Sequence, residues 1–362
     1  MAKAADLSEL LKRPTVRPSS LFEKQGEVVI CHVCNRLCKV PKGSWGYCGT
    51  RFNYDGTLYT TTYGDLSAVE SRPIEIKPFF HYWPGSTSLT FSTWSCNFDC
   101  PWCQNHHLSR SKPDPKTAFY VDPTHLVDVA VKNGDRGLCV SFNEPTMLFE
   151  YCLDVFPLAK RKGLYCCFVS NGFMTSEALD MLAKAGLDGL KVDVKGDEEV
   201  YEKYVGVKGA SLVWKNVEKA LKMGLHVEVV FLIVNGVNDS EGCIKEVIDN
   251  HLKHAGPEVP LHFTRYFPAY RFRNPPTPVE VIERAYQVAK KMGLLYPYVG
   301  NIPNHPGYHT YCPACGKPII KRFQWGVYEV KLTADKKCLY CKSSIPITGD
   351  VHVTHGGFKF FA

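Results

Sequence analysis

Three cysteines in one short segment have the spacing of ligands for an iron–sulfur cluster. The segment runs from Cys96 through Cys100 to Cys103 and directly follows a run of apolar, strand-like residues. Three thiolates can hold three irons of a cubane cluster and leave the fourth iron without a protein ligand. Catalytic metal sites keep such an open position for a substrate or cofactor. The alternative is a zinc site that the nearby His106 or His107 completes.

The same motif, Cys-x3-Cys-x2-Cys after a strand with Trp102 before the last cysteine, resembles that of the radical S-adenosylmethionine (SAM) enzymes. The resemblance implies a 4Fe-4S cluster, SAM as a second cofactor and an external one-electron reductant of the flavodoxin or ferredoxin type. It further implies reductive cleavage of SAM to a 5′-deoxyadenosyl radical that abstracts hydrogen from an unidentified substrate. An enzyme of this kind is expected to be oxygen-sensitive.

Longer sequence segments resemble one subtype within this superfamily. They are PIEIKPFFHYWPGS (residues 73–86), WSCNFDCPWCQN, SFNEPT, KVDVKG and PLHFTRYFPAY, followed by the pair Gly300-Asn301. Together they resemble AmmeMemoRadiSam-type radical SAM proteins, which are relatives of pyruvate formate-lyase activating enzyme, over nearly the whole chain. This subtype implies a functional link to Memo-like and AMMECR-like proteins. The likeness to activases makes a glycyl-radical-enzyme activase an alternative function.

Polar or aromatic side chains in the cysteine segment, at strand ends and within one strand are candidates for contact with SAM. They are Trp102, Asn143, Glu144, Ser170, Asn171, Asp193, Lys195 and His262. By resemblance, Glu144 would meet the SAM amino group and the lysine of Asp193-Val-Lys195 would meet its carboxylate. Ser170 and Asn171 could bind ribose or carboxylate, and Trp102 would lie near the adenine or shield the cluster from water. His262 could face the cofactor or be a core histidine, and no catalytic residue beyond the cluster is identified.

Two groups of four cysteines flank the central segment. The C-terminal group predicts a structural zinc site, because four thiolates close a tetrahedral shell: Cys312, Cys315, Cys338 and Cys341. The N-terminal group fits either zinc, which the sequence favours, or a second iron–sulfur cluster: Cys31, Cys34, Cys38 and Cys48. The rival hypothesis for the whole chain is a non-catalytic zinc-binding interaction protein.

Composition excludes several classes of protein. The chain has 362 residues, 45% of them hydrophobic, and a formal net charge of +7. Metal-bound thiolates would bring that charge close to neutral, so a polyanionic partner is not indicated. Sixteen cysteines without a signal-peptide pattern or membrane-spanning run predict a cytoplasmic protein with metal sites rather than disulfides. Five cysteines outside the three groups are expected to be buried thiols: Cys139, Cys152, Cys166, Cys167 and Cys243.

The elements that would position these sites alternate between apolar strands and amphipathic helices. The expected strands are 89–94, 138–142, 164–170, 189–194, 227–234 and 261–266, with a possible seventh at 294–299. Such alternation predicts a partial parallel (β/α)6 barrel, with a doubly wound sheet as the alternative. We expect three parts: a Cys-rich metal-binding region (1–85), the barrel (86–300) and a zinc-ribbon-like domain (301–362).

Overall fold

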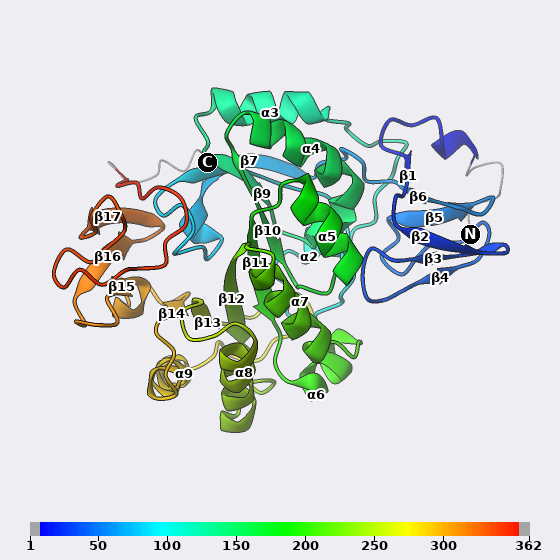
Figure 1. The fold of residues 1–362 in the computed structure, drawn as a ribbon. Coiled ribbons are helices and arrows are strands. Elements are labelled where there is room, and N and C mark those ends of the chain that lie inside the picture. The colour runs from blue at the N-terminus through cyan, green and yellow to red at the C-terminus, as the bar shows by residue number, and fades with distance from the viewer. Residues whose placement is uncertain (1–7, 355–362) are drawn as a thin grey trace.

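A computed structural model describes residues 8–354 and centres on one eight-stranded sheet (Figure 1). The strand order is β14-β13-β12-β11-β10-β9-β8-β7, with β8 to β14 parallel and β7 antiparallel to β8. The strands are β7 (Ala68–Pro73), β8 (Thr87–Ser92), β9 (Gly137–Val140), β10 (Tyr165–Ser170), β11 (Gly189–Val194), β12 (His226–Ile233), β13 (Leu261–Arg265) and β14 (Pro297–Gly300).

The predicted parallel sheet is confirmed, but the sheet has more strands than the six predicted. The possible seventh strand is present as β14, which pairs with β13. The eighth, β7, has the sequence AVESRP and a half-exposed surface, so it carries no apolar run that could reveal it. It joins the sheet as an edge strand and ends at Pro73, as expected because proline cannot donate to a sheet ladder.

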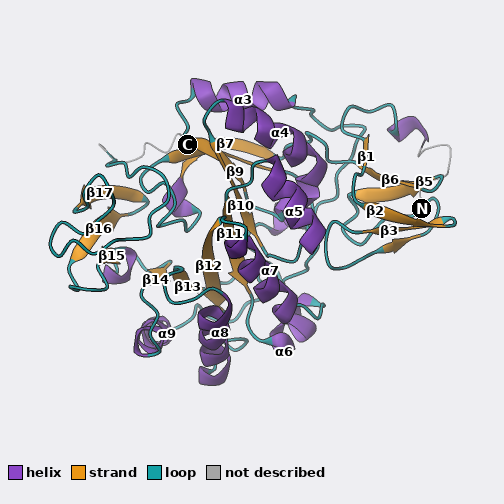
Figure 2. Cartoon of the chain, in the orientation of Figure 1, coloured by secondary structure: helices purple, strands orange, loops and turns teal. Residues whose placement is uncertain are grey.

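Helices connect the parallel strands and pack on one face of the sheet (Figure 2). They are α2 (His106–Ser109), α3 (Pro123–Lys132), α4 (Phe149–Arg161), α5 (Ser176–Ala185), α6 (Glu198–Val200), α7 (Ala210–Lys222), α8 (Glu241–His254) and α9 (Val279–Lys291). Short turns η2 (Pro145–Leu148) and η3 (Tyr201–Val205) extend α4 and α6. Asp122, Thr175 and Ser240 cap α3, α5 and α8 by accepting from backbone N–H groups.

The two faces of the sheet differ in chemistry. On the helix side, strand residues such as Leu190, Val192 and Phe231 join the main hydrophobic core. On the other face, the register places Lys191 beside Glu228 and Val230 beside His262, so charged groups line the interior of the sheet. The apolar face stabilises the fold through hydrophobic burial. The polar face carries charged side chains and continues to the carboxyl ends of the strands.

The N-terminal region forms two three-stranded sheets beside the helix side of the central sheet (Figure 1). Their strands are β1 (Arg17–Pro18), β2 (Phe22–Gln25), β3 (Val28–Cys31), β4 (Lys39–Val40), β5 (Arg51–Tyr54) and β6 (Thr57–Thr60). Asn35 N–H donates to the Phe173 carbonyl over 3.0 Å, and Cys34 forms a β-bridge with Met174. These contacts attach the N-terminal cysteines to the loop that follows β10.

The C-terminal region packs against the opposite side of the central sheet (Figure 1). It contains η4 (Pro306–Tyr308), β15 (Thr310–Tyr311), β16 (Pro318–Phe323) and β17 (Gly326–Val330). The segment after η1 (Ile74–Ile76) joins it to the sheet, because Thr348 N–H donates to the His81 carbonyl over 2.8 Å. No helix in residues 8–354 is long and apolar enough to cross a membrane.

Candidate functional site

The central cysteine loop follows β8 at the carboxyl end of the parallel sheet, where α/β proteins bind ligands. Ser95 takes a left-handed conformation (φ 71°), and its carbonyl accepts from Asn143 Nδ2 over 2.7 Å. Phe142 is also left-handed (φ 69°), and its carbonyl accepts from Asn105 Nδ2 over 2.7 Å. A bulky residue rarely adopts this conformation, so the hydrogen bonds hold a strained loop in place. Asn143, predicted to contact the cofactor, therefore also braces the cysteine loop.

The sulfurs of the three central cysteines are not gathered at the spacing of ligands to a single ion. All three are partly exposed, and Phe98 N–H donates to Cys96 Sγ over 3.3 Å. In the described part of the chain, their sulfurs do not form a group with one another or with His106 in which all ligand atoms lie within 4.8 Å. A zinc ion needs its ligands closer than that, so the alternative of a zinc site with a histidine is disfavoured.

Lys195 is a cation that lies beside the thiols of this loop. It lies close enough to Cys100 and Cys103 for their charges to interact, and it also interacts with Asp193. Burial raises the pKa of Cys100 to about 11, and Lys195 opposes that rise. Burial would also raise the pKa of Asp193, but Lys191 and Lys195 together hold it below its ordinary value. Asp193 forms its ion pair with Lys191, at 2.8 Å, and Lys195 adds a second positive charge next to the cysteine loop.

Glu144 gathers two of the other predicted residues, Ser170 and Asn171, into one buried network. Its carboxylate accepts from Ser170 Oγ over 2.9 Å, from Asn171 N–H over 2.9 Å and from Thr146 Oγ1 over 3.0 Å. Burial raises its pKa, although these donors oppose the shift. Asn171 Nδ2 continues the network by donating to Asn97 Oδ1 over 2.7 Å, next to Cys96. The structure thus brings Glu144, Ser170 and Asn171 together at the edge of the central loop.

Trp102 and His262 have different surroundings. Trp102 is buried and packs against Tyr204 and Phe272, with ring centroids 5.8 and 5.9 Å apart. His262 Nε2 lies 2.7 Å from Glu228 Oε2, and its ring stacks on Tyr298. The contacts of His262 are thus those of a buried, hydrogen-bonded core histidine on the inner face of the sheet.

Sequence reasoning missed several charged groups inside the sheet. Glu228 is fully buried and accepts from the backbone N–H groups of Phe80 and His81 over 2.8 and 2.7 Å. Lys77 lies 3.9 Å from the centre of the Phe142 ring, and burial lowers its pKa to about 8. Alternation along β11, which puts Lys191 on the same face as Asp193, is the one signal that could have revealed this interior.

The four C-terminal cysteines form a compact group that could hold one metal ion. Their sulfurs all lie within 4.8 Å of one another, with Cys312 and Cys341 3.5 Å apart and Cys315 and Cys338 3.8 Å apart. Tetrahedral coordination at about 2.3 Å places neighbouring sulfurs about 3.8 Å apart. The predicted metal ligands are therefore correctly assembled for a single tetrahedral ion.

The four N-terminal cysteines are assembled differently. They line a common cavity of about 20 Å³, together with Arg36, Arg51 and Asn97. Among the described residues, no three of their sulfurs lie within 4.8 Å of one another. The predicted ligands therefore meet, but around a wider space than in the C-terminal group. The five other cysteines are all buried, as expected.

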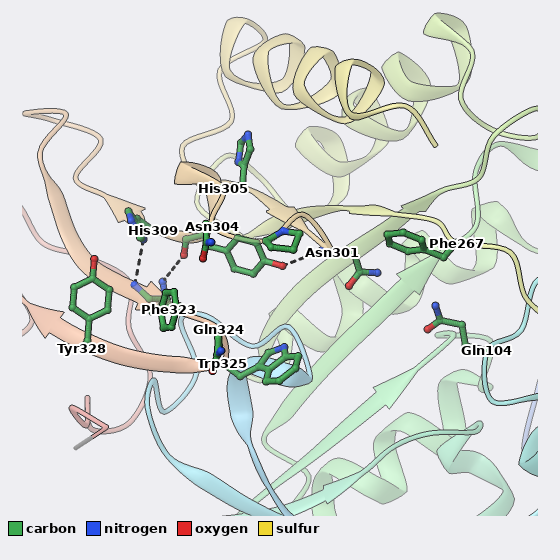
Figure 3. Close-up of a pocket in the computed structure, with 13 residues that line it drawn as sticks. Gln104, Phe267, Asn301, Asn304, His305, His309, Phe323, Gln324, Trp325 and Tyr328 are labelled. Atoms are coloured by element: carbon green, nitrogen blue, oxygen red, sulfur yellow. Dashed lines mark hydrogen bonds between the residues drawn. The ribbon is translucent and has the colours of Figure 1, made fainter. Parts of the chain in front are cut away.

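A large cavity of about 1110 Å³ lies between the central loop and the C-terminal region (Figure 3). Gln104, which directly follows Cys103, lines one end, and Asn301 after β14 lines the middle. Aromatic side chains from the loop after β13 and from the C-terminal region form much of the remaining wall: Phe267, Tyr308, Phe323, Trp325 and Tyr328. The cavity is large enough for a substantial ligand beside the cysteine loop.

Comparisons with known proteins agree with this site. Residues 92–251, which include the central cysteines, match the family model of the radical SAM superfamily. An uncharacterized protein of Methanocaldococcus jannaschii is 34% identical over 337 residues, which cover 92% of this chain and 99% of that protein. A probable GTP 3′,8-cyclase of Aeropyrum pernix is 26% identical over 288 residues, covering 73% of this chain and 76% of the relative.

Among solved structures, a radical SAM methyltransferase from Sphaerobacter thermophilus has a TM-score of 0.48 and 14% identity, covering 83% of this chain and 81% of that chain. A domain of pyruvate-formate lyase-activating enzyme from Bacteroides vulgatus has a TM-score of 0.39 and 20% identity, covering 46% of this chain and 99% of that chain. The family model and the sequence relatives carry the assignment. The chain belongs to the radical SAM superfamily, whose members are enzymes.

Proposed function

We propose that the protein cleaves SAM at a 4Fe-4S cluster bound by Cys96, Cys100 and Cys103. The observation that carries this proposal is the position of the three cysteines over the carboxyl end of the sheet, with Lys195 beside them and Glu144 in a network at the edge of their loop. When bound, the cluster and SAM supply one-electron cleavage to a 5′-deoxyadenosyl radical that takes hydrogen from the substrate. Radical SAM enzymes need an external reductant, here a flavodoxin or ferredoxin type.

The residues around the loop can hold the two charged ends of the amino-acid part of SAM. Lys195 carries a positive charge that Asp193 stabilises, which suits a carboxylate. Glu144 offers a buried carboxylate to an ammonium group, with Ser170 and Asn171 fixing its orientation. Trp102, in its aromatic cluster, keeps water from the adjacent cysteines.

The substrate would bind in the large cavity between the central loop and the C-terminal region. Gln104 connects this cavity to Cys103 through the backbone, so a ligand there lies beside the reactive centre. The aromatic wall shown in Figure 3 favours a substrate with flat or apolar groups. At the C-terminal group of four cysteines we propose a structural zinc ion, because the sulfur spacing matches tetrahedral Zn–S coordination.

The decisive experiment is an anaerobic assay of SAM cleavage. Wild-type protein, reconstituted with iron and sulfide, is mixed with SAM and dithionite, and 5′-deoxyadenosine and methionine are measured by mass spectrometry. We expect both products from the wild type and from Cys243→Ala, which removes a buried thiol outside the three groups. Cys103→Ala should lose them. A wild-type protein with a full central cluster and no 5′-deoxyadenosine would refute the proposal.

A further inference from the structure

The N-terminal cysteines are spaced more widely than the four ligands of one zinc ion. A tetrahedral zinc site needs four sulfurs about 2.3 Å from one point. Here Cys31, Cys34, Cys38 and Cys48 line one common cavity, and among the described residues no three of their sulfurs lie within 4.8 Å of one another. The C-terminal group meets the 4.8 Å spacing that a single ion requires, and the N-terminal group in the same chain does not.

A cubane cluster fits this wider arrangement. Its four irons lie at separate corners, so its thiolates must be further apart than thiolates that share one ion. The cavity is well enclosed by protein, since Cys31 and Cys34 are each 8% exposed. Two of the four thiolates are therefore well shielded from solvent, as the ligands of a buried cluster would be.

Three of the other residues that line the cavity carry buried hydrogen-bond donors without acceptors. Arg51 Nε, Arg36 Nη2 and Asn97 Nδ2 are buried atoms for which the structure gives no hydrogen-bond partner. Arg51 is 2% exposed and Asn97 is 0% exposed, so water does not readily satisfy them. Buried donors are seldom left unpaired. The inorganic sulfides of a cluster would accept these hydrogen bonds, whereas a zinc ion brings no additional acceptor.

The positive charge at the cavity also suits a cluster with four thiolates. Arg51 interacts electrostatically with Cys31 and Cys48, and its other side forms a 2.7 Å ion pair with Glu150. Arg36 stacks over the Tyr47 ring at 3.5 Å and donates to the Asn97 carbonyl. Glu150 offsets the charge of Arg51, and Arg36 adds a second positive charge beside the thiolates of a cluster whose net charge in the 2+ state is −2.

The cavity shares a wall with the central cysteine loop. Asn97 lines it and directly follows Cys96, while Ser95 Oγ donates to the Cys48 carbonyl. We propose that Cys31, Cys34, Cys38 and Cys48 bind a second 4Fe-4S cluster, beside the central one, whose sulfides accept hydrogen bonds from Arg51, Arg36 and Asn97. The zinc site favoured from the sequence alone is the alternative that this proposal replaces.

The test separates this site from the central one by removing the central ligands. A Cys96→Ala, Cys100→Ala, Cys103→Ala variant of the full chain is reconstituted anaerobically, and iron, sulfide and zinc are measured per chain. We expect about four irons, four sulfides and one zinc, with an electron paramagnetic resonance signal after dithionite reduction. Zinc at the C-terminal group reports that the chain has folded. Two zinc ions and no iron would overturn the proposal.

A reciprocal variant guards against failure of the triple variant to fold. Cys34→Ala with Cys38→Ala in an otherwise wild-type chain should halve the iron, from about eight to about four, and leave zinc unchanged. The central cluster remains in this chain, so 5′-deoxyadenosine formation can be assayed separately. A second cluster in a protein that does not cleave SAM would refute only the proposed function. SAM cleavage by a wild-type protein with four irons and two zinc ions would refute only the proposal of a second cluster.

The hydrogen-bond donors have their own readout. In the triple variant, Asn97→Leu removes one donor without adding charge. We expect unchanged iron content and a more negative reduction potential, because hydrogen bonds to cluster sulfur favour the reduced, more negative state. Asn97→Gln should recover part of the shift. An unchanged potential in Asn97→Leu would exclude Asn97 as a donor to the cluster.

Discussion

The two flanking cysteine groups have equal numbers of thiols but different geometry and surroundings. The C-terminal sulfurs gather within 4.8 Å on short turns, such as the one in which Gly316 N–H donates to the Cys312 carbonyl over 2.8 Å. The N-terminal thiols come from the shorter stretch 31–48 and enclose a cavity bordered by two arginines and an asparagine. Ligand count alone therefore does not identify a metal site. Sulfur spacing and the polar groups behind the sulfurs do.

Loss of the C-terminal ion should have the largest effect on stability. Cys338 is fully buried against Ile319 and Ile320, in a region whose three strands are short. Zinc binding contributes about 10–16 kcal/mol in small zinc domains. Cys338→Ser should therefore remove one zinc per chain and leave residues 310–347 open to limited proteolysis, with iron content unchanged. Cys243→Ala is the control, and continued protection after zinc loss would contradict a structural role.

Sequence could predict the C-terminal group because its geometry is local. Two Cys-x-x-Cys turns place sulfurs at ion spacing wherever they meet, and a hairpin brings them together. The central loop was predictable for the same reason, since its three cysteines lie within eight residues after a strand. Strand ends also placed Glu144 and Ser170 among the candidate site residues, and the structure brings the two into contact because parallel strands end at one edge.

The N-terminal site could not be resolved in this way. Its cysteine spacing is compatible with two metal groups, and the discriminating residues come from other segments. Arg51 lies on β5, and Asn97 belongs to the central loop. Glu228 was missed for a related reason: one acid inside an apolar strand gives no pattern until the register shows Lys191 beside it. The metal group of the N-terminal cysteines and the role of Glu228 both depend on contacts between residues that are far apart in the sequence.

Breaking the ion pair behind the N-terminal site should have the next largest effect. Arg51 and Glu150 are both buried, at 2% and 7% exposed, and their atoms lie 2.7 Å apart. Arg51→Met leaves an unpaired buried carboxylate, which costs about 3–5 kcal/mol. Urea denaturation of the metal-loaded protein would measure the loss. On the C-terminal side, Lys321→Met removes an exposed partner of Glu329 and should change stability little.

Adding Glu150→Gln to Arg51→Met tests whether the unpaired carboxylate of Glu150 causes the loss of stability. Because the double variant no longer contains an uncompensated charge, it should be more stable than Arg51→Met alone. Equal stability of the two variants would mean that the lost packing of Arg51, rather than the buried charge, accounts for the effect.

Protonation of His81 at acid pH should weaken the contact between the C-terminal region and the central sheet. Its ring joins the two parts of the molecule, with Nδ1 3.0 Å from the Pro346 carbonyl and Nε2 2.7 Å from the Tyr298 hydroxyl. Burial lowers the pKa of His81 from 6.5 to about 3; Glu228 opposes this shift and Arg322 adds to it. The stabilising effect of the neutral ring is complete above pH 6.5 and is lost as the pH falls toward 3. The expected loss at pH 5 is about 2 kcal/mol.

Hydrogen exchange at pH 7 and pH 5, corrected for intrinsic rates, would locate this effect. Residues 310–347 should exchange faster at pH 5 in the wild type, and His81→Gln should reduce that difference because its amide does not titrate. His251→Gln is the matched control: burial lowers the pKa of His251 to about 4, but this residue lies on α8, away from the C-terminal contact. If His251→Gln reduced the difference in exchange of residues 310–347 as much as His81→Gln does, the acid response would be a property of the whole fold rather than of the contact made by His81.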